Sequence, residues 1–150
     1  MTYYFRLPKR NDLTIGQQSA LLEKNSICVS GGPGTGKSVV VLWRHIRNHN
    51  LHKRKSLLLT YTKTLEAYLV ECANTQDTDA GFNVGRTYHW MNDSPRIFDE
   101  IIIDEAQDVN SFTYVEMKKY SQSISYGADD GQIVFPENAS TENQLKYIFP

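Results

Sequence analysis

Short apolar runs alternate along this chain with segments whose apolar residues recur at helical spacing. Three runs, over 26–30, 56–61 and 100–104, are flanked by polar or glycine residues. Runs of this length are typical of strands that are buried on both faces of a sheet. Weaker runs over 84–89 and 123–126 predict two further strands in the same series.

The segments between these runs predict helices. Residues 37–48 place their apolar side chains on one helical face, and further helices are expected over 64–73, 111–120 and 142–147. Residues 74–83 are polar and contain a glycine, so we expect a loop there. Repeated strand–helix units with buried strands predict an α/β fold, in which a parallel sheet is covered by helices on both faces.

Length and composition fit one domain. The 150 residues are 40% hydrophobic and 22% charged, which excludes a disordered tail, a fibre and a coiled coil. We expect a single domain over 1–150, with a lead-in over about 1–12. No apolar run approaches the roughly 20 residues that span a bilayer, and the N-terminus lacks a signal-peptide pattern. Because Cys28 and Cys72 form neither a disulfide framework nor a metal spacing, we expect a soluble, cytoplasmic protein without a membrane partner.

The net charge of −1 hides an uneven distribution. Eight basic and no acidic residues lie between Glu23 and Glu66, whereas 15 acidic and five basic residues follow from Glu66 onward. Such asymmetry indicates either a local surface for a polyanion or the solvated end of a helix, from Arg44 to Lys55. The total charge provides no long-range attraction to nucleic acid, so both interpretations stay open.

A glycine-rich segment follows the first predicted strand and opens the first predicted helix. It fits the phosphate-loop pattern of Gly, four residues, Gly-Lys and then Ser or Thr. Glycines let the backbone approach a polyphosphate, and the amide groups at the helix start face it. Lys37 supplies a charge to the β- and γ-phosphates, and the Ser38 hydroxyl is placed to bind Mg²⁺. The predicted nucleotide-binding residues here are Gly31, Gly32, Pro33, Gly34, Thr35, Gly36, Lys37 and Ser38.

An acidic pair follows the strand predicted over 100–104. In a parallel sheet, side chains at this end of a strand face the ligand crevice. Asp104 would hold Mg²⁺, directly or through water, and Glu105 would polarise the attacking water. The other interpretation is an acidic pair at the start of a helix, which needs no nucleotide. With the phosphate loop upstream, the pair indicates hydrolysis, with Glu105 and Lys37 as catalytic residues.

The run Asp-Glu-Ala-Gln-Asp at 104–108 resembles the second motif of superfamily 1 helicases of the UvrD/Rep-like group. Other motifs of that group follow in the same order, so the resemblance extends from about Leu13 to Phe135. It implies a RecA-like phosphate-loop domain that binds ATP and Mg²⁺ as cofactors.

Two glutamines are implied by the resemblance alone. The segment 13–20 is similar to the family's adenine-reading glutamine motif, for which Gln17 is the better match and Gln18 the fallback. The segment 128–132 is similar to the third motif, in which Gln132 would couple the nucleotide site to the nucleic-acid strand.

Two further segments resemble the parts of these helicases that contact single-stranded nucleic acid. They follow the second and third predicted strands, at 58–65 and 85–90. The resemblance implies single-stranded DNA, in preference to RNA, as a partner. The contacts would come from Tyr61, Thr62, Lys63, Thr87, Tyr88 and His89. From the residues alone, Tyr61, Tyr88 and Trp90 fit the core as well as they fit base stacking.

Three departures from the family pattern bear on activity. Position 128 is alanine where the family usually has glycine, and only 14 residues separate His89 from Asp104, too few for the family's inserted helical subdomain. The second RecA-like domain, with its arginine at the γ-phosphate, has no counterpart in these residues. We therefore expect weak or no hydrolysis by this domain alone, and a second RecA-like domain in the same protein or in a partner.

Together these patterns predict the ATP-binding motor domain of a superfamily 1 helicase-like protein, in which Mg²⁺-dependent hydrolysis drives translocation on single-stranded nucleic acid. Two other functions stay open. One is a phosphate-loop ATPase without nucleic-acid coupling, which would share only the first two motifs. The other is a non-hydrolysing nucleotide-binding interaction module, which the short length favours and the intact Lys37, Ser38, Asp104 and Glu105 oppose.

Overall fold

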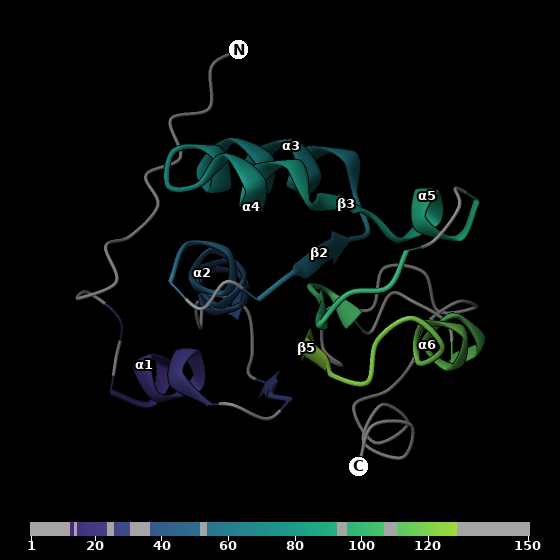
Figure 1. Cartoon of the computed structure of the whole chain (residues 1–150), viewed down its shortest axis with the longest axis horizontal. Coiled ribbons are helices and arrows are strands. Elements are labelled where there is room, and N and C mark those ends of the chain that lie inside the picture. The colour runs from purple at the N-terminus through teal and green to yellow at the C-terminus, as the bar shows by residue number, and fades with distance from the viewer. Residues whose placement is uncertain are drawn as a thin grey trace.

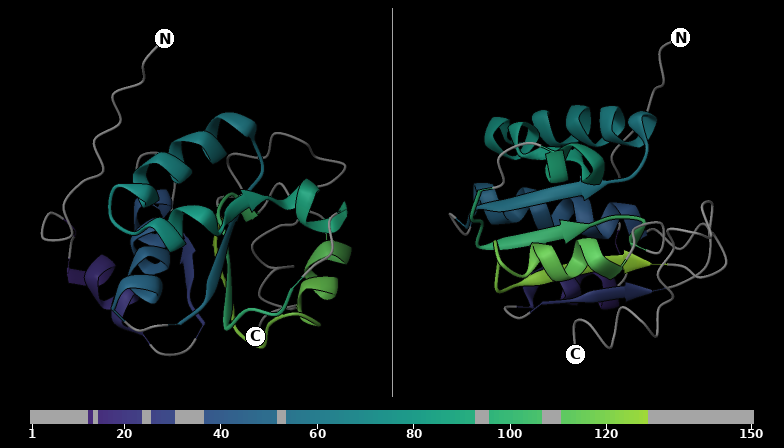
Figure 2. Two further views of the ribbon diagram at one scale, coloured as in Figure 1. Left: turned by 45° about the horizontal axis from the view of Figure 1, so that its top comes forward. Right: turned by 90° about the vertical axis from the view of Figure 1, so that its right-hand side faces the viewer.

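A five-stranded parallel sheet forms the centre of the molecule. The computed structural model describes residues 13, 15–23, 26–30, 37–51, 54–92, 96–106 and 111–128. The strands lie in the order β1-β5-β4-β2-β3, and every neighbouring pair is parallel (Figure 2). Their carboxyl ends therefore meet at one edge of the sheet. The strands are β1 (Cys28–Ser30), β2 (Ser56–Thr60), β3 (Val84–Arg86), β4 (Glu100–Ile103) and β5 (Ile124–Ala128).

Helices cover both faces of the sheet (Figure 1). The first four helices and the last two belong to separate apolar clusters on opposite sides of the strands. The predicted α/β fold with a parallel sheet is thereby confirmed. No helix in the described ranges has the length and apolar character needed to cross a bilayer. The helices are α1 (Ile15–Leu22), α2 (Lys37–Asn50), α3 (Lys63–Asn74), α4 (Thr78–Phe82), α5 (Thr87–Asn92) and α6 (Ser111–Met117).

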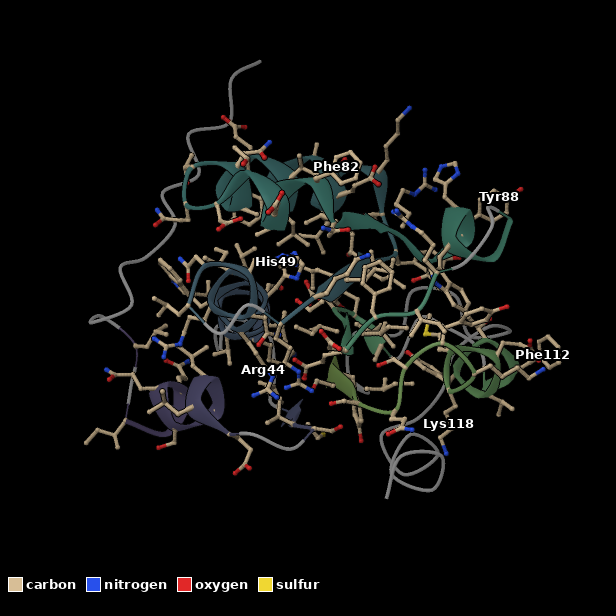
Figure 3. The ribbon with its side chains drawn as sticks, in the orientation of Figure 1. Arg44, His49, Phe82, Tyr88, Phe112 and Lys118 are labelled. Atoms are coloured by element: carbon tan, nitrogen blue, oxygen red, sulfur yellow. The ribbon has the colours of Figure 1, made fainter. Side chains whose placement is uncertain are left out.

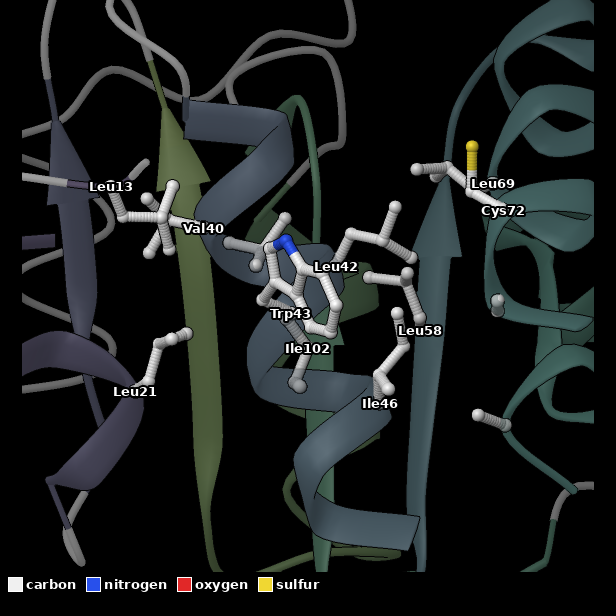
Figure 4. Close-up of a cluster of buried hydrophobic side chains, with 13 residues drawn as sticks. Leu13, Leu21, Val40, Leu42, Trp43, Ile46, Leu58, Leu69, Cys72 and Ile102 are labelled. Carbon is white, nitrogen blue, oxygen red and sulfur yellow. The ribbon is translucent and has the colours of Figure 1, made fainter. Parts of the chain in front are cut away.

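Successive strand residues alternate between the two clusters. Leu58 of β2 and Ile102 of β4 are register partners in the cluster with α2 and α3 (Figure 4). The next pair, Leu59 and Ile103, lies in the cluster with α5 and α6, where β5 adds Tyr126. These five side chains are at most 2% exposed. Both faces of the central strands are buried, which is why their sequence runs show no polar alternation.

The expectation of a strand over 84–89 is wrong beyond Arg86, because the chain turns into α5 at Thr87. Thr87 and Trp90 are 5% and 7% exposed, whereas the two residues between them are exposed. Burial three residues apart is the period of a helix. In so short a segment, β-branched and aromatic residues indicate a strand just as well.

The expected loop over 74–83 contains the short helix α4. The Asp77 carboxylate accepts a hydrogen bond from the Ala80 amide at 3.0 Å and so caps the helix start. A Cβ on Gly81 would lie 1.8 Å from Asn74 Oδ1, so this glycine lets α4 approach the end of α3 closely. The polar composition of the segment thus comes from a cap and a close helix contact.

The remaining predicted elements are confirmed, with ends that differ from the prediction by at most three residues. The exception is the helix predicted over 142–147, which lies outside the described residues. Cys28 and Cys72 are both free thiols, the first exposed and the second buried.

Candidate functional site

The segments predicted to be functional follow the strands at the carboxyl edge of the sheet. β1 leads into the phosphate-loop segment, β4 into Asp104 and Glu105, and β5 into the third-motif segment. β2 leads into Tyr61, and β3 into Thr87. In the strand order, β1 and β5 lie on one side of β4, and β2 and β3, which precede the predicted nucleic-acid segments, lie on the other.

Lys37 and Ser38 form the first turn of α2. The Lys37 side chain is 7% exposed, and the half-buried Ser38 side chain hydrogen-bonds to the Asp104 carboxyl group. The Lys37 charge also acts on Asp104, whose pKa it lowers. The structure therefore brings the predicted lysine, hydroxyl and carboxylate together from two elements that are far apart in the sequence.

Asp104 is fully buried at the end of β4. Burial, followed by the charge of Glu105, raises the pKa of Asp104 to about 7, while the Ser38 hydroxyl, the Glu105 amide and Lys37 oppose the shift. Its Oδ2 atom has no hydrogen-bond partner among the residues that the structure describes. Leaving a carboxylate oxygen buried and unpaired costs free energy, and a role as a metal ligand would explain the arrangement.

The donor set around Asp104 fits Mg²⁺. This ion prefers hard oxygen ligands and completes its shell with water and phosphate oxygens. Asp104 supplies a carboxylate and Ser38 a hydroxyl, and the two groups already lie in contact. A cation at Asp104 would favour the ionised carboxylate and so lower its pKa again.

Glu105 has an unusual backbone conformation. Its φ is 56°, in the left-handed region that non-glycine residues rarely adopt. Its amide donates to Asp104 Oδ1 at 3.1 Å, which links the two acidic residues through a sharp turn after β4. The Ala106 carbonyl, just beyond the turn, accepts a hydrogen bond from the Tyr114 hydroxyl of α6. Such strain, of order 1–3 kcal/mol, persists where the surrounding structure imposes it, often at functional sites.

Gly127 in β5 belongs to the site, although the sequence motifs do not include it. β5 separates β1 from β4, so these two strands lie about 10 Å apart, which is two strand spacings. A Cβ built on Gly127 would lie 3.8 Å from Asp104 Oδ1 and 3.6 Å from Val41 Cγ1. The missing side chain leaves the space beside the Asp104 carboxyl group open. Only its position just before the third-motif segment hints at this in the sequence.

α1 carries the predicted adenine-reading glutamines, both half-buried. The Gln18 side-chain amide donates to the Leu13 carbonyl oxygen at 2.8 Å, a contact within its own segment. This contact gives Gln18 a structural role within its own segment. The other predicted nucleotide residues lie outside the described residues: Gly31, Gly32, Pro33, Gly34, Thr35, Gly36 and Gln132.

Arg44 fits neither interpretation of the basic stretch. It is 1% exposed and pairs with Glu100, so it forms neither a polyanion surface nor a solvated helix end. Arg47 is also buried, at 7% exposed. The exposed Lys55 lies with its Nζ 5.2 Å from the centroid of the Phe98 ring. Charge counting alone cannot separate a buried ion pair from a surface patch.

The segment after β2 combines structural and accessible groups. Tyr61 is half-buried against the second apolar cluster. The Thr62 hydroxyl accepts a hydrogen bond from the Leu65 amide at 3.2 Å and caps the start of α3. The next side chain, Lys63, is exposed.

The segment after β3 likewise contains both structural and accessible side chains. The buried Thr87 hydroxyl donates to the Thr60 carbonyl oxygen at 3.4 Å, which ties α5 to β2. Tyr88 is 68% exposed and projects from α5 (Figure 3), and its ring lies 5.6 Å from that of His89 in an edge-to-face arrangement. Trp90 is buried against Tyr120, as expected of a core aromatic.

Comparisons with known proteins agree with a helicase-like fold. Residues 24–150 match a family model described as Schlafen group 3, DNA/RNA helicase domain. Among solved structures, the UvsW helicase from bacteriophage T4 is similar, with a TM-score of 0.62 and 13% sequence identity over 90% of this chain. At that identity the likeness concerns the fold alone, and this chain spans 56% of the UvsW chain. No curated protein matches.

Proposed function

Because this chain belongs to the family of Schlafen group 3 DNA/RNA helicase domains, we propose that it is the ATP-binding motor domain of a superfamily 1 helicase-like protein. The main support is the convergence of the Lys37 charge and the Ser38 hydroxyl on the buried Asp104 carboxyl group. Two motifs that the sequence predicts separately thus meet at one group. Phosphoryl transfer from ATP needs a phosphate-binding cation and a metal ligand at one place.

Each group of the site has a role in this proposal. Lys37 binds the β- and γ-phosphates as a point charge, while Ser38 and Asp104 hold Mg²⁺. The bound ion would neutralise negative charge on the phosphate oxygens. Glu105 orients the attacking water and accepts its proton at a carboxylate oxygen. Gln17 on α1 reads adenine, which makes ATP the nucleotide.

The contacts between neighbouring strands support coupling to nucleic acid. The Asp104 amide donates to the Leu59 carbonyl oxygen at 2.8 Å, so the end of β4 is tied to β2. β2 continues through Thr60, which accepts the Thr87 hydroxyl from the start of α5. A shift at the Asp104 carboxylate on nucleotide binding would therefore reach both nucleic-acid segments through direct hydrogen bonds.

Single-stranded DNA, in preference to RNA, would cross this half of the carboxyl edge. The exposed Lys63 would bind a phosphate, which makes binding salt-sensitive. Tyr88 and His89 would stack on bases without sequence preference. Thr62 and Thr87 would act by fixing the starts of α3 and α5.

Complete turnover would need a second RecA-like domain, in the same protein or in a partner, with an arginine at the γ-phosphate. Lack of such an arginine lowers comparable rates by about 10³–10⁵. Hydrolysis by these residues alone is accordingly weak, whereas nucleotide binding does not depend on the second domain.

Calorimetric titration of the protein with Mg·ATPγS, with and without a short oligo-dT, tests the proposal. Nucleotide affinity that changes when oligo-dT is present supports both sites and their coupling. Nucleotide binding that responds to neither oligo-dT nor oligo-U indicates a phosphate-loop ATPase without nucleic-acid coupling. The absence of nucleotide binding contradicts the proposed site altogether.

A pair of lysine variants makes the titration specific. Lys37→Met should remove nucleotide binding, because it deletes the charge at the phosphates. Lys118→Met removes one charge at an exposed position near β1 and should leave nucleotide binding unchanged. Equal effects of the two variants would argue against Lys37 as the phosphate ligand.

A further inference from the structure

Thr60, the last residue of β2, carries a buried hydroxyl that has no part in the proposed function. The residue is fully buried, and its Oγ1 atom has no hydrogen-bond partner among the residues that the structure describes. The predicted nucleic-acid contacts begin at the next residue, Tyr61, and Thr60 serves them only through its carbonyl oxygen, which accepts the Thr87 hydroxyl. A buried hydroxyl without a partner costs free energy that the isosteric valine would avoid, so packing alone does not account for this threonine.

Thr60 and Asp104 occupy neighbouring positions in adjacent parallel strands. β2 and β4 pair in register as far as Leu59 and Ile103, so Thr60 and Asp104 are the next pair. The Asp104 amide donates to the Leu59 carbonyl oxygen at 2.8 Å, which shows that the strands stay paired at this point. The unpaired hydroxyl therefore lies next to the proposed metal ligand.

Both side chains belong to the face of the sheet that α2 covers. Residues two apart in a strand share a face, and Leu58 and Ile102, two residues earlier, pack in the cluster with α2 (Figure 4). Asp104 accordingly contacts Ser38 in the first turn of α2. Neighbouring strands lie about 4.8 Å apart, a span that a threonine hydroxyl and an aspartate carboxylate on one face can close by rotation about the threonine χ1.

The two unpaired atoms are chemically complementary. Thr60 Oγ1 has a proton to donate, and Asp104 Oδ2 is an acceptor that no described group serves. The other carboxylate oxygen, Oδ1, accepts the Glu105 amide and lies beside Gly127 of β5, on the opposite side of β4 from β2. Because Thr60 Oγ1 is inaccessible to solvent, the partner that it can reach is a neighbouring side chain.

We propose that Thr60 is a positioning residue of the proposed Mg²⁺ site: its hydroxyl donates to the Asp104 carboxylate and holds it in the orientation that binds the ion. A carboxylate oxygen has two lone pairs, so Oδ2 can accept this hydrogen bond and still serve as a metal ligand. Carboxylates that bind metals are generally held by such hydrogen bonds, whose loss typically lowers metal affinity about 10–100-fold. The inference rests on the proposed function and adds a residue that does not itself touch the metal.

Calorimetric titration with ATPγS, in saturating Mg²⁺ and in EDTA, tests this role. Thr60→Val keeps the shape of the side chain and removes the hydroxyl, so the dissociation constant in Mg²⁺ should rise about 10–100-fold. Thr60→Ser keeps the hydroxyl and should bind nearly as well as the parent. In EDTA all three proteins should bind ATPγS equally, because Thr60 contacts no phosphate in the proposed site.

Two further comparisons guard against effects on folding. Thr60→Ala and Thr60→Ser differ by the hydroxyl, so this pair tests the inference even if Thr60→Val does not fold. Thr113→Val is the matched control, because Thr113 is a buried threonine of α6, on the opposite face of the sheet. Its ATPγS affinity should stay at the parental value in both Mg²⁺ and EDTA.

Thermal denaturation separates positioning from a structural role. Without nucleotide, Thr60→Val should melt at the parental temperature or above it, since it removes an unpaired buried hydroxyl. With Mg·ATPγS at one fixed concentration, its melting temperature should rise less than that of the parent, because binding is weaker. A lower melting temperature without nucleotide, together with parental Mg·ATPγS affinity, would show that the hydroxyl is structural.

The outcomes separate this inference from the proposed function. Parental Mg·ATPγS affinity in Thr60→Val and Thr60→Ala overturns the role of Thr60 and leaves the motor domain standing. Weakening that is equal in Mg²⁺ and in EDTA also overturns it, because the effect would then not depend on the metal. If the parent protein binds no nucleotide, or binds ATPγS equally with and without Mg²⁺, the proposed metal site fails, and the role of Thr60 with it.

Discussion

Arg44 in α2 and Glu100 at the start of β4 form a buried ion pair, in which Arg44 Nε and Nη2 each lie 2.9 Å from Glu100 Oε2. Asn48 and Ser125 also donate to this carboxylate, so its acceptor capacity is well used. The remaining guanidinium nitrogen, Nη1, donates to the carbonyl oxygens of Ala20 and Glu23 at 2.8 Å.

This ion pair connects the end of α1 with the start of β4. α1 carries Gln17, and Asp104 directly follows β4. A single side chain, Arg44 of α2, thereby holds the segments that carry the proposed adenine reader and metal ligand together (Figure 3).

Breaking the ion pair should destabilise the fold strongly. Arg44→Met leaves the Glu100 carboxylate buried and uncompensated, and we expect a loss of about 3–5 kcal/mol in the free energy of unfolding. Arg54→Met is the control: Arg54 is 27% exposed and lies 3.9 Å from Glu100, so its loss should cost no more than about 1 kcal/mol. Urea denaturation measures both. Equal losses in the two variants would contradict the special role of Arg44.

His45 should make the protein sensitive to acid. Its Nδ1 lies 2.7 Å from the Ser56 hydroxyl and its Nε2 2.8 Å from the Ala80 carbonyl oxygen, in a fully buried setting. Burial lowers the pKa of His45 to about 3; the hydrogen bond to Ala80 opposes the shift, and His49 and Asp77 make smaller contributions in opposite directions. The unfolded chain, with a histidine pKa near 6.5, therefore takes up a proton that the folded protein does not.

The stability that neutral His45 contributes is complete above pH 6.5 and is lost progressively as the pH falls toward 3. Between pH 7 and pH 5 this amounts to about 2 kcal/mol. A His45→Gln variant lacks the titration, so its stability deficit relative to the parent should shrink by that amount at pH 5. A deficit that is the same at both pH values would show that His45 does not titrate in this way.

Glu105→Gln should separate nucleotide binding from hydrolysis. The amide keeps the shape of the side chain but cannot accept a proton from water. We expect parental Mg·ATP affinity and hydrolysis lowered by about 10²–10⁴, measured on the full-length protein with saturating oligo-dT. Retained hydrolysis would remove Glu105 from the catalytic role.

Glu105→Asn should cost activity without costing stability. Asparagine tolerates the left-handed region better than glutamate, so the φ of 56° becomes less strained. We expect a free energy of unfolding equal to the parental value or up to about 1 kcal/mol higher, together with lost hydrolysis. Thermal denaturation checks the first expectation, and a marked loss of stability would show that the Glu105 side chain has a structural role.

Gly127→Val should impair nucleotide binding while the fold is kept. The contacts that a Cβ would make, 3.6–3.8 Å, are ordinary, so Gly127→Ala should be tolerated and serves as the control. The larger side chain of valine would occupy the space beside Asp104 Oδ1, where the proposed Mg²⁺-bound nucleotide lies. Calorimetry with Mg·ATPγS should show weaker binding for Val than for Ala.

The sequence by itself determined the central strands, the helices α2, α3 and α6, and the local motifs of this protein. The apolar runs predict the central strands, and the glycine-rich segment before α2 identifies Lys37 and Ser38. The apolar run over 100–104 identifies Asp104 and Glu105 as the acidic pair at its end. Each of these signals depends on the periodicity or backbone chemistry of one continuous segment. The sequence of that segment is therefore sufficient to identify it.

Only the tertiary structure decided which of these segments are neighbours and which charges are buried. The place of β5 between β1 and β4 gives Gly127 its position beside Asp104. From the sequence alone Arg44 resembles a surface charge, and only the tertiary structure shows that it pairs with Glu100 in the interior. Burial and pairing depend on contacts between residues far apart in the chain, and the free energy of a charge depends on those contacts more than on its sequence neighbours.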